Sequence, residues 1–211
     1  FDHVGYINVS SNNLTVLPNT FLIHFPKLRI IDVSNNRIEA LHSNTFEGIS
    51  PNILLLDNNE LEALSPLIFS ASLRRLSISN NKISAIPSYT LHNLPDLQYI
   101  NLAHNRLNSL PRDFLQTSSK IEDLIVSDNR LTRIDPRIFD GKQIGNVDFS
   151  RNWITLLTSH QFDIIQNIGQ LDVSYNEITG LPNHLFNTDI ELELDSLDLT
   201  GNSLYNIAPH F

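Results

Sequence analysis

Apolar and polar residues alternate in short stretches that recur along the whole chain. Residues 31–38 read IDVSNNRI, residues 100–107 read INLAHNRL, and residues 147–154 read VDFSRNWI. The shared pattern is apolar-x-apolar-x-x-Asn-x-apolar. Its first three positions alternate as a short strand with one buried face does, so the pattern predicts a strand at the start of each copy.

An asparagine marks the sixth position of every copy. The copies follow one another at separations of 22 to 26 residues. A fixed period in this range predicts a solenoid, in which each copy forms one coil of the stack. The nine marker residues are Asn12, Asn36, Asn59, Asn81, Asn105, Asn129, Asn152, Asn176 and Asn202.

The stacking explains why these residue types recur. One short strand cannot bury enough apolar surface alone, so the copies must pair side by side as a parallel sheet. The chain turns after each strand, and an Asn side chain can satisfy the backbone groups left inside that turn because it both donates and accepts hydrogen bonds. We expect a ladder of asparagines, with a second stack ten residues further on, at Phe46, Phe69, Phe139, Phe162 and Phe186, replaced elsewhere by Leu22, Leu91 and Leu115.

These motifs resemble the leucine-rich repeat family, and specifically its typical subclass with repeats of about 24 residues. The resemblance implies an α/β solenoid: a curved right-handed coil with a parallel β-sheet on the concave side and irregular or short helical segments on the convex side. The pattern extends over residues 1–211, which we interpret as a single array of about nine repeats.

Composition narrows the class of protein. Hydrophobic residues make up 41% of the chain, enough for a continuous core, and no apolar run is long enough to span a membrane. The first residues do not show the basic and apolar pattern of a signal peptide, so none is predicted within this sequence. The formal net charge of −9 argues against nucleic acid as the partner.

The chain contains no cysteine. In the family that the chain resembles, extracellular members usually close both ends of the repeat array with disulfide-bonded caps. Here Val4, Ile7 and Val9 already belong to a repeat, and the chain stops at Phe211, inside another. Because exposed end repeats would uncover the core, we expect an interior segment of a longer array, with any membrane anchor outside this chain. The alternative is a cytosolic or bacterial protein without disulfides.

Two sequons for N-linked glycosylation lie in the first repeat. Asn8 and Asn13 are each followed two residues later by Ser or Thr, with no intervening Pro. Asn8 is predicted to point outward from its strand, and Asn13 to lie just beyond the ladder. Both are candidate glycan acceptors in a secreted protein, and the alternative is a chance match in a chain rich in Asn and Ser.

Catalytic and metal-binding patterns are missing. The sequence has no His-Glu-x-x-His unit, no glycine-rich phosphate loop and no nucleophile elbow, and its eight histidines are scattered. We therefore predict no catalytic residue, metal or cofactor. One acidic run comprises Asp189, Glu191, Glu193, Asp195 and Asp198. Because this run lacks the glycine turn of a calcium loop, we interpret it as a solvated strand face and not as a metal site.

The outward strand positions carry the candidate binding residues. Aromatic, aliphatic and Arg side chains on an exposed face are typical of protein interfaces. In the first five repeats these are Tyr6, Ile30, Ile53, Leu55, Arg75 and Tyr99. Three later repeats place Asp148, Asp172 and Asp198 in line, an acidic strip that would attract a basic partner. The alternative is that the acids serve solubility and the apolar residues are ordinary surface.

The sequence also predicts a third row of outward-facing residues and one exposed tryptophan. The residues two before each marker Asn, such as Ser79 and Ser150, are small and polar, and we expect them to face outward as well. Trp153 follows a marker Asn and is expected to be half exposed, packing against the turn rather than anchoring a partner.

These observations favour a non-enzymatic, extracellular or cell-surface module that recognises a protein partner, with a second copy of itself as one candidate. Within the family, long cysteine-free arrays resemble chaoptin-like adhesion proteins of insects, which implies cell adhesion. The alternative is the ligand-sensing ectodomain of a Toll-like innate-immune or developmental receptor. An enzyme or enzyme inhibitor is the least favoured class.

Overall fold

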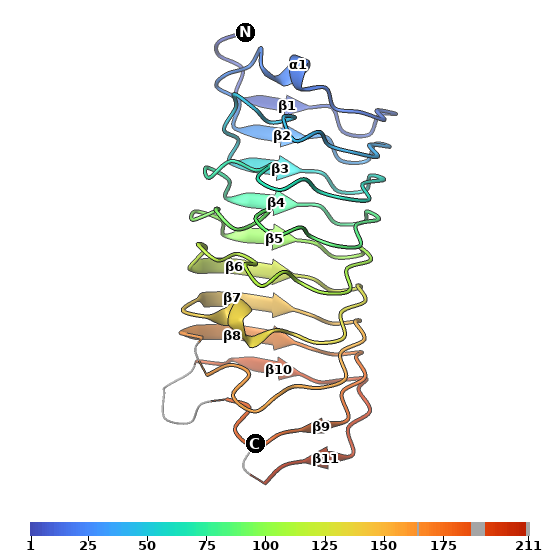
Figure 1. The fold of residues 1–211 in the computed structure, drawn as a ribbon, viewed down its shortest axis with the longest axis vertical. Helices are drawn as coiled ribbons and strands as arrows, with labels where there is room; N and C mark the ends of the chain where they lie inside the picture. Colours follow the sequence, from blue (N-terminus) through green and yellow to red (C-terminus); the bar gives the residue numbers. More distant parts are fainter. Residues whose placement is uncertain (164, 187–192, 210–211) are drawn as a thin grey trace.

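The computed structural model describes residues 1–163, 165–186 and 193–209, and it forms a stack of coils (Figure 1). One strand from each coil enters a parallel sheet of nine strands within these residues, in the order β1-β2-β3-β4-β5-β6-β7-β8-β10. The strands are β1 (Tyr6–Asn8), β2 (Ile30–Asp32), β3 (Ile53–Leu55), β4 (Arg75–Ser77), β5 (Tyr99–Asn101), β6 (Lys120–Ile125), β7 (Gln143–Asp148), β8 (Asn167–Asp172) and β10 (Ser196–Asp198).

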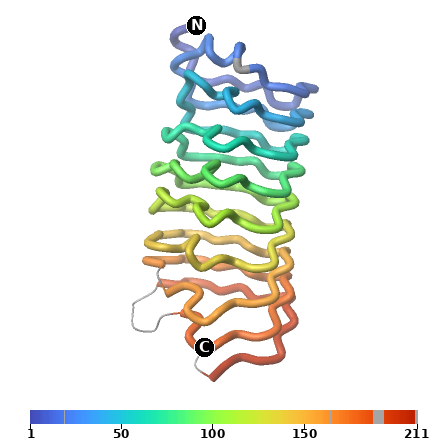
Figure 2. The backbone as a smooth tube through the Cα atoms, viewed as in Figure 1, coloured from blue at the N-terminus to red at the C-terminus, as the bar shows by residue number. Residues whose placement is uncertain are grey.

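Little other regular structure is present in the described part of the chain. A second parallel pair joins β9 (Gly180–Leu181) to β11 (Asn206–Ile207). The helical segments are one α-helical turn, α1 (Asn19–Leu22), and a 3-10 turn (Pro136–Phe139) whose first backbone groups are capped by Asp135. The trace in Figure 2 shows successive turns lying side by side, with the two termini at opposite ends of the stack. The predicted solenoid with a parallel sheet is confirmed.

The sheet register follows the repeat of the sequence. Ile31 pairs with Leu54, and Leu54 pairs with Leu76, so equivalent residues of successive repeats are neighbours. In a strand of three residues only the middle side chain faces the core, because side chains alternate between the two faces. Ile31, Leu54 and Leu76 are accordingly fully buried. β3 begins at Ile53, after Pro51, which has no N–H to donate to the sheet.

Three strands, β6, β7 and β8, begin three residues earlier than the others. The extension brings backbones close together at two glycines. A Cβ atom on Gly145 would lie 2.7 Å from the carbonyl oxygen of Glu122, and one on Gly169 would lie 2.7 Å from that of Gly145. Real Cβ atoms do not tolerate such distances, so glycine at both positions is what permits the longer pairing.

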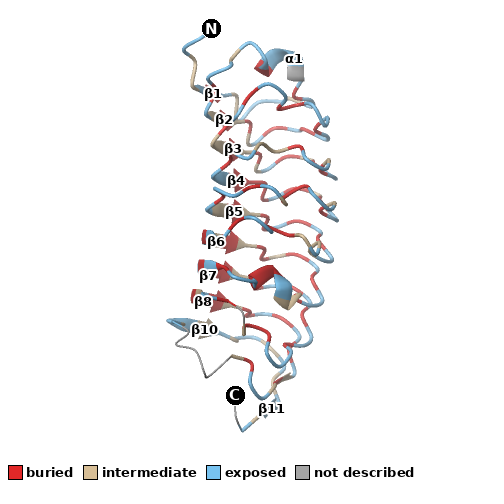
Figure 3. Cartoon of the chain, turned by 60° about the vertical axis from the view of Figure 1, so that its left-hand side comes forward, coloured by how far each residue is buried: buried red, intermediate tan, exposed pale blue. Residues whose placement is uncertain are grey.

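Buried apolar residues recur in each coil from that of β1 to that of β8 (Figure 3). Behind the sheet, the predicted aromatic stack is confirmed in two pieces. The ring centroids of Phe46 and Phe69 are 6.3 Å apart, and Phe162 lies 5.0 Å from Phe139 and 5.2 Å from Phe186. Leucines fill the equivalent buried positions between the two pieces.

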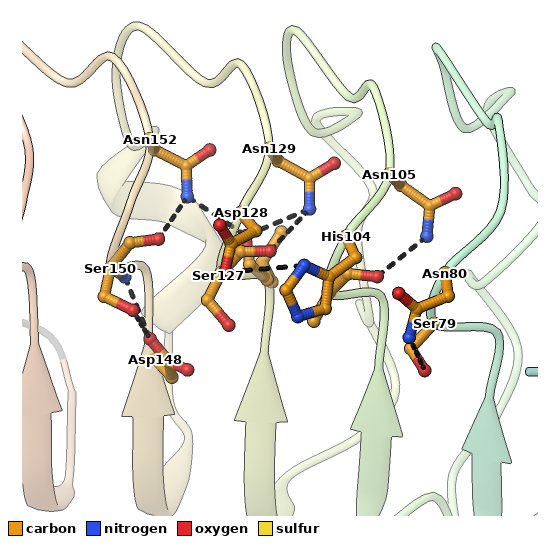
Figure 4. A network of polar contacts seen from close by, with 12 residues as sticks. Ser79, Asn80, His104, Asn105, Ser127, Asp128, Asn129, Asp148, Ser150 and Asn152 are labelled. Carbon is orange, nitrogen blue, oxygen red and sulfur yellow. Dashed lines mark hydrogen bonds and ion pairs between the residues drawn. The ribbon is translucent and has the colours of Figure 1, made fainter. Parts of the chain in front are cut away.

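The asparagines stand in a hydrogen-bonded column along the stack. The Nδ2 group of Asn129 donates to the carbonyls of Val126 and Ser127 in its own repeat and to that of Leu102 in the preceding repeat. Its Oδ1 accepts from the backbone N–H of Leu107. Figure 4 shows neighbouring members of this column beside the strand ends. Each interior Asn thus closes its own turn and ties it to the preceding coil.

Candidate functional site

The candidate site is the solvent-facing side of the nine-stranded sheet, called here the strand face. Each strand ends in a bend, which the residue four before the marker Asn stabilises in most repeats. The carboxylate of Asp148 accepts hydrogen bonds from the backbone N–H of Ser150, at 2.9 Å, and from its hydroxyl, at 2.6 Å. Asp172 accepts from Ser174 N–H in the same way. These carboxylates therefore stabilise the local fold as well as carrying charge.

The acidic strip lies in register across β7, β8 and β10. Asp148 is paired with Asp172, and Asp172 with Asp198. Hydrogen bonds from Thr200 hold the pKa of the exposed Asp198 below its ordinary value. The structure thus brings the three predicted acids into one row. In each carboxylate, Oδ1 accepts a hydrogen bond from the turn that follows its strand, and the other oxygen takes no part in that bond.

The residues two before the marker Asn differ in exposure. Ser79, Ser127, Ser150 and Ser174 are buried, which was not predicted, whereas Ser10, Ser34 and Asp57 are partly exposed and Thr200 is exposed. The reason is the bend: the hydroxyl of Ser150 turns back to Asp148, and that of Ser79 donates to Asp57 of the preceding repeat at 2.7 Å. These bonds to carboxylates at the strand ends explain why the serines are buried.

The predicted apolar group occupies neighbouring strands. Tyr6 pairs with Ile30, then Ile53, Arg75 and Tyr99 follow in unbroken register across β1 to β5. Leu55 lies two residues beyond Ile53 on the same face of β3. The guanidinium carbon of Arg75 is 3.5 Å from the ring centroid of Tyr99. Tyr6 is 53% exposed and the aliphatic members are partly exposed.

The two sequon asparagines lie on the surface of the first repeat. Asn8 is exposed on β1, and its amide donates to the hydroxyl of Tyr6 while its Oδ1 accepts from Ser10. Asn13 is also exposed, immediately after the first ladder residue. Both positions offer access to a modifying enzyme, and their use as glycan acceptors remains a prediction.

Within the described ranges, no three His, Cys, Asp or Glu side chains gather as metal ligands. Asp189 and Glu191 of the acidic run lie outside those ranges. His160 forms a 2.6 Å contact with Asp163 and stacks on His184, with ring centroids 5.9 Å apart. None of the helices in the described part of the chain has the length and apolar character that a bilayer crossing requires.

Sequence reasoning missed the residue immediately before each marker Asn. This residue adopts positive φ in all nine repeats, between 52° and 56° for the non-glycine members and 72° at Gly201. Asn, Asp and Gly tolerate this conformation best, and five of the nine positions carry them, which was a usable signal. The conformation directs exposed side chains along the stack: the guanidinium of Arg151 lies 4.4 Å from the Tyr175 ring, and His104 contacts Asp128 at 3.5 Å (Figure 4).

Two other positions were only partly foreseen. Trp153 is 51% exposed, as predicted, and lies 5.9 Å from the guanidinium of Arg130. Lys142 is buried, with its ammonium donating to the carbonyl of Leu115 at 2.9 Å. Burial lowers the pKa of Lys142. The equivalent position holds an apolar residue in other repeats, such as Ile49 and Leu94. The sequence therefore shows Lys142 as a departure from the repeat pattern, but its burial was not predicted.

The family model for "Leucine rich repeat" matches residues 2–51, 52–107 and 97–143. The chain belongs to the leucine-rich repeat family. The matched segments together cover more than half of the chain, and the remaining repeats continue the same register of strand, positive-φ residue and asparagine.

Curated relatives match part of the chain at moderate identity. Chaoptin of Drosophila melanogaster is 30% identical over 143 residues, which are 67% of this chain and 11% of the relative. Keratocan of Bos taurus is 29% identical over 141 residues, 64% of this chain and 40% of the relative. An adenylate cyclase of Schizosaccharomyces pombe is 32% identical over 137 residues, 63% and 8% respectively. The chain thus spans well under half the length of these relatives.

Solved structures share the fold. The TLR13–ssRNA13 complex superposes with a TM-score of 0.70 at 22% identity, covering 91% of this chain and 28% of that one. The Toll–Spatzle complex of Drosophila gives 0.68 at 20% identity, covering 97% and 36%. Since an array of this fold occurs in a complex with single-stranded RNA, the prediction from net charge that nucleic acid is excluded is not supported.

These findings establish a coarse class. The chain is a leucine-rich repeat solenoid, a fold that typically serves as a non-enzymatic module for protein–protein interaction. The adenylate cyclase match covers a small part of that long protein. The strand face therefore remains the first place to look for a partner.

Proposed function

We propose that this array is an extracellular or cell-surface recognition module that serves cell adhesion, with a second copy of the chain as the first partner to test. The similarity to Chaoptin and the resemblance to chaoptin-like adhesion arrays support this proposal. The exposed sequons Asn8 and Asn13 support an extracellular setting.

One observation carries the proposal: the unbroken row from Tyr6 through Ile30, Ile53 and Arg75 to Tyr99 on β1 to β5. Its members are aliphatic, aromatic and Arg side chains, the types that dominate the centres of protein interfaces. The row runs along the stack on rigid, paired strands, so binding would fix few additional backbone torsions and lose little entropy. With Leu55 beside it, the row offers a partner a continuous partly apolar surface.

A Toll-like receptor ectodomain is the alternative. The Toll–Spatzle complex in its glycosylated form superposes over 96% of this chain with a TM-score of 0.65 at 25% identity. In that case the acidic strip of Asp148, Asp172 and Asp198 would bind a basic ligand, and the array would not associate with itself.

Analytical ultracentrifugation over a broad concentration series tests the two readings. Adhesion through the row predicts concentration-dependent dimers that dissociate in the Ile53→Asp/Leu55→Asp variant, because a carboxylate in a closing apolar contact loses its hydration. The matched control is Ile23→Asp/Leu67→Asp, which changes two exposed apolar residues outside the sheet. A monomer at all concentrations would rule out self-association through this array and favour the receptor. Equal dimerisation of both variants would place the contact elsewhere.

Glycosylation is tested separately by secretion from eukaryotic cells. We expect the secreted chain to lose apparent mass on treatment with an N-glycosidase, and the Asn8→Gln/Asn13→Gln variant to show no such loss. An unchanged mass of the parent chain after treatment would remove the sequons as support for an extracellular setting.

A further inference from the structure

The residue immediately after each marker Asn occupies a second column at the edge of the strand face. The backbone N–H of Lys82, Arg106 and Arg130 each donates to the carbonyl two residues beyond the marker Asn of the preceding repeat, at 2.8 Å in all three cases. These bonds form a parallel ladder, so the three residues succeed one another at about the 4.8 Å spacing of paired strands. We call Lys82, Arg106 and Arg130 the cationic column.

The column is only partly neutralised by the rest of the chain. Lys82 forms an ion pair with Glu60 at 2.8 Å. Arg106 and Arg130 are exposed, and within the described residues neither forms an ion pair. The pair with Glu60 stabilises Lys82, whereas Arg106 and Arg130 are like charges at successive places of the ladder and repel each other. The column stands out because the whole chain carries a net charge of −9.

Aromatic side chains lie near these positions in the later repeats. Trp153 follows Asn152 and takes the next place of the ladder, whereas Arg151 and Tyr175 each precede a marker Asn. The guanidinium of Arg130 lies 5.9 Å from the ring of Trp153, and that of Arg151 lies 4.4 Å from the ring of Tyr175. Both rings are about half exposed. The two arginines are therefore held against rigid aromatic surfaces, which reduces the conformational entropy they would lose on binding an anion.

We infer that the cationic column is a binding surface for a sulfated polysaccharide. A row of cations at constant spacing fits a linear polymer that carries an anionic group at many successive positions. Guanidinium groups bind oxyanions such as sulfate through two parallel hydrogen bonds. Rotation about its glycosidic linkages lets such a chain bring a sulfate to each cation of the row in turn.

Other polyanions fit the surface less well. On an extended acidic peptide, side chains on one face recur at about 6.8 Å, which does not match a column spacing of about 4.8 Å. Single-stranded nucleic acid binds through aromatic faces on which its bases stack. Here the rings of Trp153 and Tyr175 each already lie beside a guanidinium group, and the positions of Lys82, Arg106 and Arg130 offer no ring for a base to stack on.

The test is binding of the folded array to immobilised heparin, a sulfated polysaccharide, at an ionic strength of about 0.15 M. We expect the Arg106→Glu/Arg130→Glu variant to lose about tenfold or more in affinity and to show a shallower dependence on salt, because fewer counterions are released on binding. The control Lys27→Glu/Arg112→Glu makes the same change in net charge at exposed residues outside the column, and should bind like the parent. Circular dichroism confirms that each variant is folded.

Each other outcome counts against the inference. Equal loss in both variants would indicate attraction by overall charge alone, and equal binding of desulfated heparin would exclude sulfate recognition. Tighter binding of poly(U) RNA, competing with heparin at the same arginines, would assign the column to nucleic acid instead. Self-association is measured independently through Ile53 and Leu55, so failure of either proposal leaves the other standing.

Discussion

At the scale of single residues, the marker asparagines connect sequence to fold most directly. Interior members such as Asn129 are buried and make bonds to two repeats at once. Burying an amide is unfavourable unless its donors and acceptor are satisfied, and at this position all are. This requirement explains why the asparagines recur at a nearly constant spacing in the sequence.

Replacing Asn129 with Ala is therefore expected to lower the free energy of unfolding by about 2 to 4 kcal/mol, because the backbone N–H of Leu107 loses its buried acceptor and three carbonyls each lose one of two hydrogen bonds. Urea titration followed by circular dichroism measures the loss. Asn108→Ala, at an exposed position, is the control and should stay within about 0.5 kcal/mol of the parent. Similar losses in the two variants would refute the structural role of the column.

Lys142 gives a prediction with a defined pH dependence. Burial lowers its pKa from the ordinary value of 10.5, so the folded state binds this proton more weakly than the unfolded state. The buried charge thus costs stability at neutral pH, and the cost shrinks as the pH rises from the folded-state pKa toward 10.5. Lys142→Met should raise stability at neutral pH by about 1 kcal/mol, since Leu115 still accepts a bond from Ser118 N–H.

Thermal or urea unfolding of the Lys142→Met variant at several alkaline pH values tests this sign. The gain over the parent should diminish as the pH increases. Lys120→Met, at the exposed start of β6, is the control for removing a lysine charge that is not buried. A destabilised Lys142→Met variant with a difference that is independent of pH would contradict the assignment.

At the scale of elements, the sequence predicts what depends on local alternation and misses what depends on neighbouring coils. The three-residue strands and the outward positions of Ile53 and Asp148 follow from a period of two. The longer β7 and β8 do not, because their pairing depends on the close approach of one backbone to another at Gly145 and Gly169. The burial of residues such as Ser150 was missed for a similar reason: it follows from the positive-φ bend beyond the strand, which the alternation does not contain.

The aromatic stack behind the sheet is the element most sensitive to loss of volume. Phe162 is fully buried between Phe139 and Phe186. Phe162→Ala should cost about 3 to 5 kcal/mol through lost burial and the cavity left behind. Phe162→Leu should cost less, because Leu occupies the equivalent buried position in other repeats, such as Leu91.

Equilibrium unfolding in urea ranks these variants. Phe21→Ala is the control, since this ring on α1 is 39% exposed and should contribute about 1 kcal/mol or less. The expected order of stability loss is Phe162→Ala, then Phe162→Leu, then Phe21→Ala. If Phe162→Leu were as damaging as the alanine variant, the ring contacts rather than the filled volume would control this stack.

At the scale of the whole molecule, every coil contacts only the coils beside it, so stability is distributed along the stack. The first ladder residue, Asn12, is exposed, and its side-chain bonds go to Val9 and Ser10 of its own repeat. In the last described repeat, Leu197 and Leu199 are only partly buried. The first described repeat thus has a ladder residue bonded only within its own turn, and the last described repeat has less burial to lose on opening than the central ones.

Amide hydrogen exchange read by mass spectrometry should show this gradient. Peptides covering β5 to β7, where Leu102 and Val126 donate to the next coil and are fully buried, should exchange more slowly than peptides covering β1 or β10, by about tenfold or more. Opening at an end breaks contacts with one neighbouring coil, whereas opening at the centre breaks contacts with two. Asn129→Ala should then accelerate exchange in the repeats on both sides of it, because its bonds join them. Uniform protection along the chain would instead mean that the array opens as a single unit, and that the cost of losing one ladder residue is shared by all coils.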